Sequence, residues 1–141
     1  MGPGLPDDRA MSFNFYLYRA AAGLGPLTTW EKMQAEALGS AEQVRGRIAA
    51  LYPQIRWTLH EQTWSGLGPN GAGEPYLDLM LREDEPGVCR MVVLNKAAPS
   101  VMRRLLEALD LNYVCAPEAG DLVDVYAYTD EDRYYAKQAW S

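Results

Sequence analysis

Two apolar runs joined by a short acidic turn constrain the fold of this chain more than any other feature. The segment 76–81 alternates, with its leucines on one face, and the segment 88–94 is apolar except for Arg90. Alternation with a period of two is typical of a half-buried strand, whereas a mostly apolar run favours a central strand. The acidic turn Glu83–Gly87 is too short for a crossover, so the pair predicts an antiparallel hairpin inside a sheet.

Helix patterns precede this hairpin. Two capping boxes, Thr28–Glu31 and Ser40–Gln43, place a hydroxyl three residues before a carboxylate or an amide. Such a pair satisfies the free N–H groups where a helix begins. We therefore expect one helix over about residues 30–38 and a second over residues 44–52, which Pro53 ends.

One more helix and four more strands complete the expected elements. Ser100 is the expected N-cap of a helix that continues to Leu109. The glycine-rich segment 64–73 is expected to be a flexible connection. Alternating patterns predict strands over residues 12–18, 55–60, 112–115 and 122–128. In the second of these strands, Leu59 is expected to face the core.

The order of elements predicts the fold class. Helices grouped against strands that do not alternate with them favour an α+β two-layer sandwich. We expect a mostly antiparallel sheet of about five to six strands, with two to three helices on one face. A length of 141 residues suits one domain. We expect residues 1–10 to be a disordered N-terminal extension and residues 11–141 to form a single α+β domain.

The chain offers few residues for catalysis or metal binding. His60 is its single histidine, and the neighbouring Glu61 would point to the opposite face of a strand. No zinc spacing, calcium loop, phosphate-binding motif or serine-nucleophile motif is present. We therefore expect no enzyme activity, no bound metal and no cofactor.

Both cysteines lie in apolar, strand-like runs. We expect Cys89 and Cys115 to be buried, reduced thiols, with a disulfide as the alternative if their strands pair. The N-terminus has no basic region followed by an apolar one, as a signal peptide would, and no apolar run is long enough to cross a membrane. A cytoplasmic location is the expectation that follows.

Charge and aromatic content point to a protein partner. The net charge of −6 disfavours nucleic acid and anionic membranes, and it suits a basic protein. Tyrosines interleaved with carboxylates are typical of a binding surface, and a tryptophan can anchor one, although Trp64 could equally be part of the core. The candidate partner-binding residues are Trp64, Glu83, Asp84, Asp121, Asp124, Tyr126 and Tyr128.

Several short motifs also occur in a characteristic order. The chain shows M-S-x-x-x-Y-x-x at Met11–Tyr18, a proline-marked helix end at Leu51–Pro53 and a tryptophan-glycine segment at Trp64–Gly73. A proline then opens a helix at Pro99, and G-x-x-x-D follows at Gly120–Asp124. In this order the chain resembles the small bacterial immunity-type proteins that are encoded beside toxin genes.

The resemblance implies an activity without turnover. Such a protein neutralises a cognate toxin by stoichiometric binding, here a toxin that acts in the cytosol. The acidic composition makes a basic toxin the expected partner, because opposite charges speed encounter. Two alternatives stay open: a self-associating domain, which would form a homodimer, and a small-ligand-binding domain without catalysis.

Overall fold

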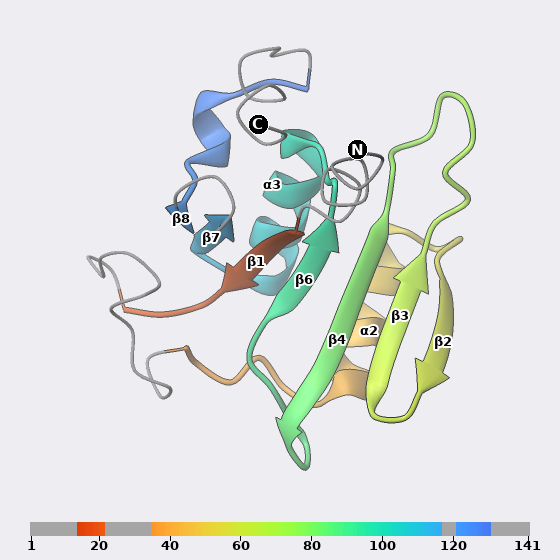
Figure 1. The fold of residues 1–141 in the computed structure, drawn as a ribbon, viewed down its shortest axis with the longest axis vertical. Helices are drawn as coiled ribbons and strands as arrows, with labels where there is room; N and C mark the ends of the chain where they lie inside the picture. The colour runs from red at the N-terminus through yellow and green to blue at the C-terminus, as the bar shows by residue number, and fades with distance from the viewer. Residues whose placement is uncertain (1–13, 22–34, 117–120, 131–141) are drawn as a thin grey trace, which may run out of the picture.

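The computed structural model describes residues 14–21, 35–116 and 121–130 (Figure 1). Its elements in chain order are β1 (Asn14–Tyr18), α2 (Ala41–Leu51), β2 (Arg56–His60), β3 (Thr63–Leu67), β4 (Asp78–Glu85), β5 (Val88–Cys89), β6 (Val92–Asn95), α3 (Pro99–Leu109), β7 (Tyr113–Ala116), β8 (Asp121–Leu122) and the 3-10 helix η4 (Val125–Ala127). No helix among these residues is long and apolar enough to cross a membrane.

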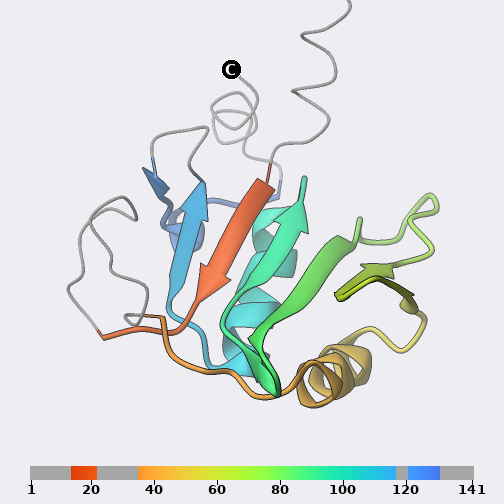
Figure 2. The same cartoon turned by 60° about the horizontal axis from the view of Figure 1, so that its bottom comes forward.

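The strands form one antiparallel sheet, and the α+β fold class is confirmed. Their order is β2-β3-β4-β6-β1-β7-β8, with β5 paired to β4 beyond the end of β6. The sheet therefore has more strands than the five to six expected. Both α2 and α3 cover the same face, α2 behind β3 and β4 and α3 behind β6 and β1 (Figures 1 and 2).

The core lies between this face and the two helices. Leu79 of β4 pairs with Leu94 of β6, which pairs with Phe15 of β1, and all three side chains are buried. Helix α2 contributes Val44 and Ile48 to the same cluster. The predicted central hairpin is confirmed, because β6 lies between β4 and β1.

The glycine-rich segment differs from its prediction. Residues 63–67 form β3 in unbroken register with both β2 and β4. A Cβ atom at Gly66 would lie 2.7 Å from Ile55 and from the ring of Trp57. The absence of a side chain at Gly66 therefore leaves room for Ile55 and Trp57 to pack over β3. The connection that follows is anchored by Asn70, whose Oδ1 accepts the N–H of Leu77 at 2.8 Å.

The helix expected over residues 30–38 is wrong where it can be checked. Residues 22–34 lie outside the described residues, and residues 35–38 are not helical. Instead, the N–H of Leu38 donates to the carbonyl of Cys89 at 2.7 Å, and the N–H of Cys89 donates to Gly39 at 2.7 Å. Backbone bonds to β5 replace those of a helix here.

Helix α2 has the predicted N-terminal capping box, and it covers Ala41–Leu51 where residues 44–52 were expected. Ser40 Oγ accepts the N–H of Gln43 at 3.1 Å, and Gln43 Oε1 accepts the N–H of Ser40 at 2.9 Å, which is the predicted capping box. The helix ends at Leu51, two residues before Pro53.

Helix α3 is capped differently from the prediction. Its N-cap is Ala98, and Ser100 lies inside the helix. Asp130 supplies the missing cap, because Oδ1 accepts the N–H of Ser100 at 2.8 Å and Oδ2 accepts its hydroxyl. At the other end, Arg19 donates to the carbonyls of Leu109 at 2.7 Å and Asp110 at 2.8 Å.

The strand expected over residues 122–128 is also wrong beyond Leu122. Residues 125–127 form η4, and the Asp124 carboxylate accepts the N–H of Tyr126 at 3.0 Å. Arg103 fixes the segment from α3 by donating to the carbonyls of Val125 at 2.8 Å and Tyr128 at 2.6 Å. Local capping and this arginine stabilise the turn against an extended strand.

Candidate functional site

A groove opens where the N-terminus of α2 meets two tight turns of the sheet, at the lower end of Figure 1. Its volume is about 570 Å³. The β2–β3 turn contributes Glu61, and the β4–β5 turn contributes Pro86. Its acidic residues are Glu42, Glu61, Glu83, Asp84 and Glu85, against one basic residue, Arg45. We call this site the acidic groove.

Arg45 and Trp64 pack together in the acidic groove. The guanidinium carbon of Arg45 lies 3.7 Å from the ring centroid of Trp64 and 6.0 Å from that of Trp57. Trp64 is half-buried and packs against the core with its other side. Trp64 is therefore part of the groove lining and also packs against the core, so the two roles considered for it occur together.

The Glu83 carboxylate accepts backbone hydrogen bonds from two walls of the acidic groove. Its Oε2 accepts the N–H of Ala41 at 2.8 Å, and its Oε1 accepts the N–H of Gly87 at 2.9 Å. These two backbone hydrogen bonds lower the pKa of the Glu83 carboxyl. Since one carboxylate bonds the first turn of α2 and the β4–β5 turn, it fixes two walls of the groove relative to each other.

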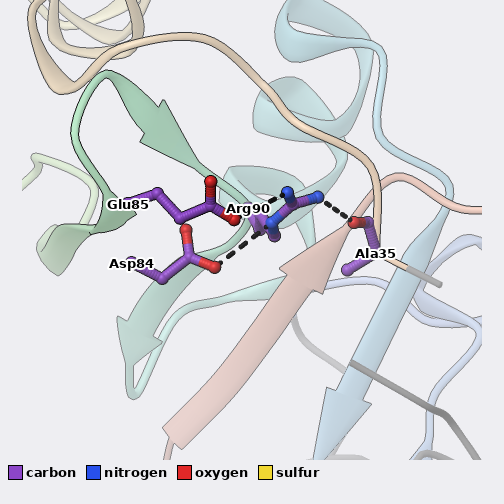
Figure 3. Close-up of polar contacts among 4 residues, drawn as sticks. All are labelled: Ala35, Asp84, Glu85 and Arg90. Atoms are coloured by element: carbon purple, nitrogen blue, oxygen red, sulfur yellow. Dashed lines mark hydrogen bonds and ion pairs between the residues drawn. The ribbon is translucent and has the colours of Figure 1, made fainter. Parts of the chain in front are cut away.

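Asp84 and Glu85 are positioned by one arginine (Figure 3). Arg90 Nε donates to Asp84 Oδ2 at 3.2 Å, and Nη2 approaches Glu85 Oε2 at 3.5 Å. Arg90 Nη1 also donates to the carbonyl of Ala35 at 2.8 Å. The arginine ties the acidic turn to the segment that leads into α2, and it leaves both carboxylates partly exposed to solvent.

The structure divides the seven predicted binding residues into two groups. Trp64, Glu83 and Asp84 line the acidic groove. Asp124 and Tyr126 instead border a hollow of about 350 Å³ between α3 and the end of the sheet. We call Asp124, Tyr126 and Tyr128 the C-terminal cluster. The fourth predicted residue of that region, Asp121, begins β8, and its side chain lies outside the described residues.

The C-terminal cluster does not lie on one strand face, although the strand expected over residues 122–128 would place its three residues on one face. Tyr126 is 59% exposed, whereas Tyr128 is half-buried and packs against the core. Asp124 directs one carboxylate oxygen to the backbone of η4. A 3-10 turn spaces residues three per turn, so the alternation that predicted a shared face does not apply here.

Most residues that line the acidic groove were not predicted as binding residues, among them Glu61, Leu59 and Arg45. Glu61 occupies a turn position with a positive φ of 58°, and its side chain is exposed. Leu59, expected to face the core, is 52% exposed because β2 is the edge strand beyond the cover of α2. No sequence spacing indicates that Arg45 of α2 would meet Trp64 of β3.

A smaller cavity of about 290 Å³ lies at the opposite end of α2. It is lined mostly by apolar residues, among them Ile55, Leu77 and the prolines Pro53, Pro69 and Pro75, with Glu74 as its one acidic residue. Such a lining suits an apolar group rather than a charged one.

The residues with reactive side chains lie apart from one another. His60 is exposed at the end of β2. Cys89 and Cys115 are both buried, and neither is in a disulfide. Their strands do not pair, because β5 pairs with β4 and β7 pairs with β1 and β8. Among the described residues, no group of three or more histidines, cysteines and carboxylates could hold a metal ion.

Comparison with other proteins identifies no relative: no family model, no curated protein and no solved structure matches this chain.

Proposed function

We propose that this domain binds a basic protein partner through the acidic groove. The observation that carries the proposal is the gathering of five carboxylates from three separate segments around one hollow. Segments far apart in the sequence contribute, namely the start of α2, the β2–β3 turn and the β4–β5 turn. Their field adds to the net charge of −6 and would attract a positively charged surface.

The groove also offers apolar surface for tight contact. Leu59 and Trp64 line it, and Pro86 stands at its rim. Carboxylates speed the encounter of two proteins, whereas buried apolar and aromatic side chains slow their dissociation. A partner that covers the groove with arginines and one apolar side chain would use both features.

The resemblance to immunity-type proteins suggests what this partner is. We propose that the domain neutralises a cognate toxin by one-to-one binding, without catalysis and inside the cytoplasm. The groove supports this proposal because it offers a charged, partly apolar surface.

Co-expression tests the proposal. The toxin candidate is the product of the gene beside the one that encodes this chain. We expect cells that express both proteins to grow and the two to co-elute in gel filtration as a one-to-one complex. Equal cell death with and without this domain, together with separate elution, would contradict the proposal.

A further inference from the structure

The free edge of β2 offers a second interaction surface, on the opposite side of the strand from β3. Among the described residues, β2 is the first strand of the sheet and pairs only with β3. Its five residues contain no proline, and their pairing with β3 has no bulge. Natural sheets usually protect an open edge, which is a template for another strand, with proline, a bulge, a short strand or charged side chains, and Arg56 is the one charged residue among Arg56–His60.

The turn at the end of β2 shows which backbone groups reach that edge. His60 pairs directly with Thr63 across a two-residue turn, in which Glu61 has the positive φ that a type II′ turn needs at its first position. Such a turn closes on a hydrogen-bonded pair. By alternation, Arg56 and Thr58 also bond to β3, and Trp57 and Leu59 direct their N–H and C=O groups to the free edge.

The next pair of strands confirms this alternation. The N–H of Gly68 donates to the carbonyl of Leu77 at 2.9 Å, so the even-numbered residues of β3 bond to β4. The odd-numbered residues, including Thr63 and Ser65, therefore bond to β2.

We propose that β2 pairs with β2 of a second copy of this chain, antiparallel about a two-fold axis at Thr58. In this register, Trp57 of each copy lies opposite Leu59 of the other, and both residues present unpaired backbone groups to the edge. Four backbone hydrogen bonds then form between two identical strands. The interface is closed and uses the same surface on both copies, as a two-fold dimer requires.

The side chains of β2 fit this register. Leu59 lies on the face that α2 covers, yet it is 52% exposed because no neighbouring strand shields it. Trp57 of the second copy would lie directly opposite Leu59 on the same face, with its ring over Gly66 of its own β3. On the open face of the sheet, Thr58 would meet Thr58, a pair that is neutral and β-branched. The proposal does not depend on the partner-binding role of the acidic groove.

A cysteine at the two-fold axis tests the register directly. Opposed residues of a non-hydrogen-bonded antiparallel pair have Cα atoms about 4.5 Å apart, which a disulfide can bridge. Under mild oxidation, we expect Thr58→Cys to form a covalent dimer of twice 15.7 kDa. Ser65→Cys is the matched control, because Ser65 lies beside Thr58 on the same face but one strand inward. It should remain monomeric.

Sedimentation of the unmodified protein adds a second test. We expect concentration-dependent dimers that Leu59→Lys weakens at least about tenfold, because the ammonium group would lose water beside the strand of the second copy. Leu67→Lys is the control, since Leu67 is 44% exposed on the open face of β3. A monomeric wild-type protein, or a Thr58→Cys variant that cross-links no faster than Ser65→Cys, would overturn the proposal. Charge reversal at Glu42, which tests the acidic groove, should leave the dimer unchanged.

Discussion

The acidic groove and the C-terminal cluster are built from the same types of residue, yet they present different surfaces. In the groove, the turns of the sheet direct exposed carboxylates around a hollow that Trp64 and Leu59 also line. In the C-terminal cluster, Asp124 accepts a hydrogen bond from its own turn and Tyr128 packs against the core. Tyr126 is therefore the largely exposed tyrosine of the two.

The difference teaches that composition alone does not define a binding surface. A carboxylate within two or three residues of a free backbone N–H is readily used as a cap. Asp124 is used in this way, and Asp130 reaches across the fold to cap α3. In the groove, Glu42 and Glu61 are exposed at the positions where the walls meet. We therefore expect acidic residues of the two regions to affect different properties.

The largest effect on stability is expected at Gly66 of β3, where Ile55 and Trp57 pack against the strand. Gly66→Ala would place a methyl group 2.7 Å from Ile55 and Trp57, and it should lower the free energy of unfolding by about 1–3 kcal/mol. Gly71→Ala is the control, because no atom would contact its added carbon. Chemical denaturation measures both. Equal stability of the two variants would mean that Gly66 does not set the position of Trp57.

Asp130 should be important for stability and not for partner binding. Asp130→Ala removes the cap of α3, and we expect a loss of about 1 kcal/mol in the free energy of unfolding. Glu107→Ala, an exposed change on the same helix, should have little effect. Thermal and urea denaturation provide the comparison. If Asp130→Ala weakened partner binding without loss of stability, the division between the two regions would be wrong.

The Arg45–Trp64 contact should contribute a smaller amount. Arg45→Ala removes the guanidinium from the tryptophan face and should cost about 0.5–1 kcal/mol of unfolding free energy. Arg47→Ala, on the exposed side of the same helix, serves as the matched control. Urea denaturation followed by tryptophan fluorescence reports both changes. No difference between the variants would show that the stack does not stabilise the groove.

The smallest effect is a pH dependence from Glu83. Its folded-state pKa is lowered, so its contribution to stability is present above the ordinary carboxyl pKa of about 4.3 and is lost as pH falls through the lower folded value. Glu83→Gln should therefore be less stable than wild type at pH 7, and the gap should shrink below about pH 4. A gap that stayed constant with pH would contradict the role assigned to the two backbone hydrogen bonds.

Regular patterns made much of the fold predictable. The leucine alternation of β4, the capping box at Ser40 and the end of α2 before Pro53 all rest on interactions between residues near in sequence. Such signals are decided locally, so they can be seen without a structure. Two of the predicted partner-binding residues, Glu83 and Asp84, line the acidic groove, and their role in binding stays a prediction.

The errors arise where distant residues decide the local structure. Backbone bonds to Cys89 hold residues 35–38 extended, and Arg103 helps to turn residues 125–128 away from a strand. The contact of Arg45 with Trp64 depends on how α2 crosses the sheet, which no sequence period encodes. Asp130 caps α3 from 30 residues away. These contacts have no signature within a window of sequence.

The association rate of the partner tests the central claim, that the acidic groove binds a basic protein. We compare Glu42→Lys/Glu61→Lys in the groove with Glu74→Lys/Glu107→Lys, which changes two exposed carboxylates outside it and gives the same net charge. With the product of the adjacent gene as partner, the groove variant should associate at least about tenfold more slowly at low salt, and the control less than about threefold. Equal slowing of both variants would contradict a binding site in the groove.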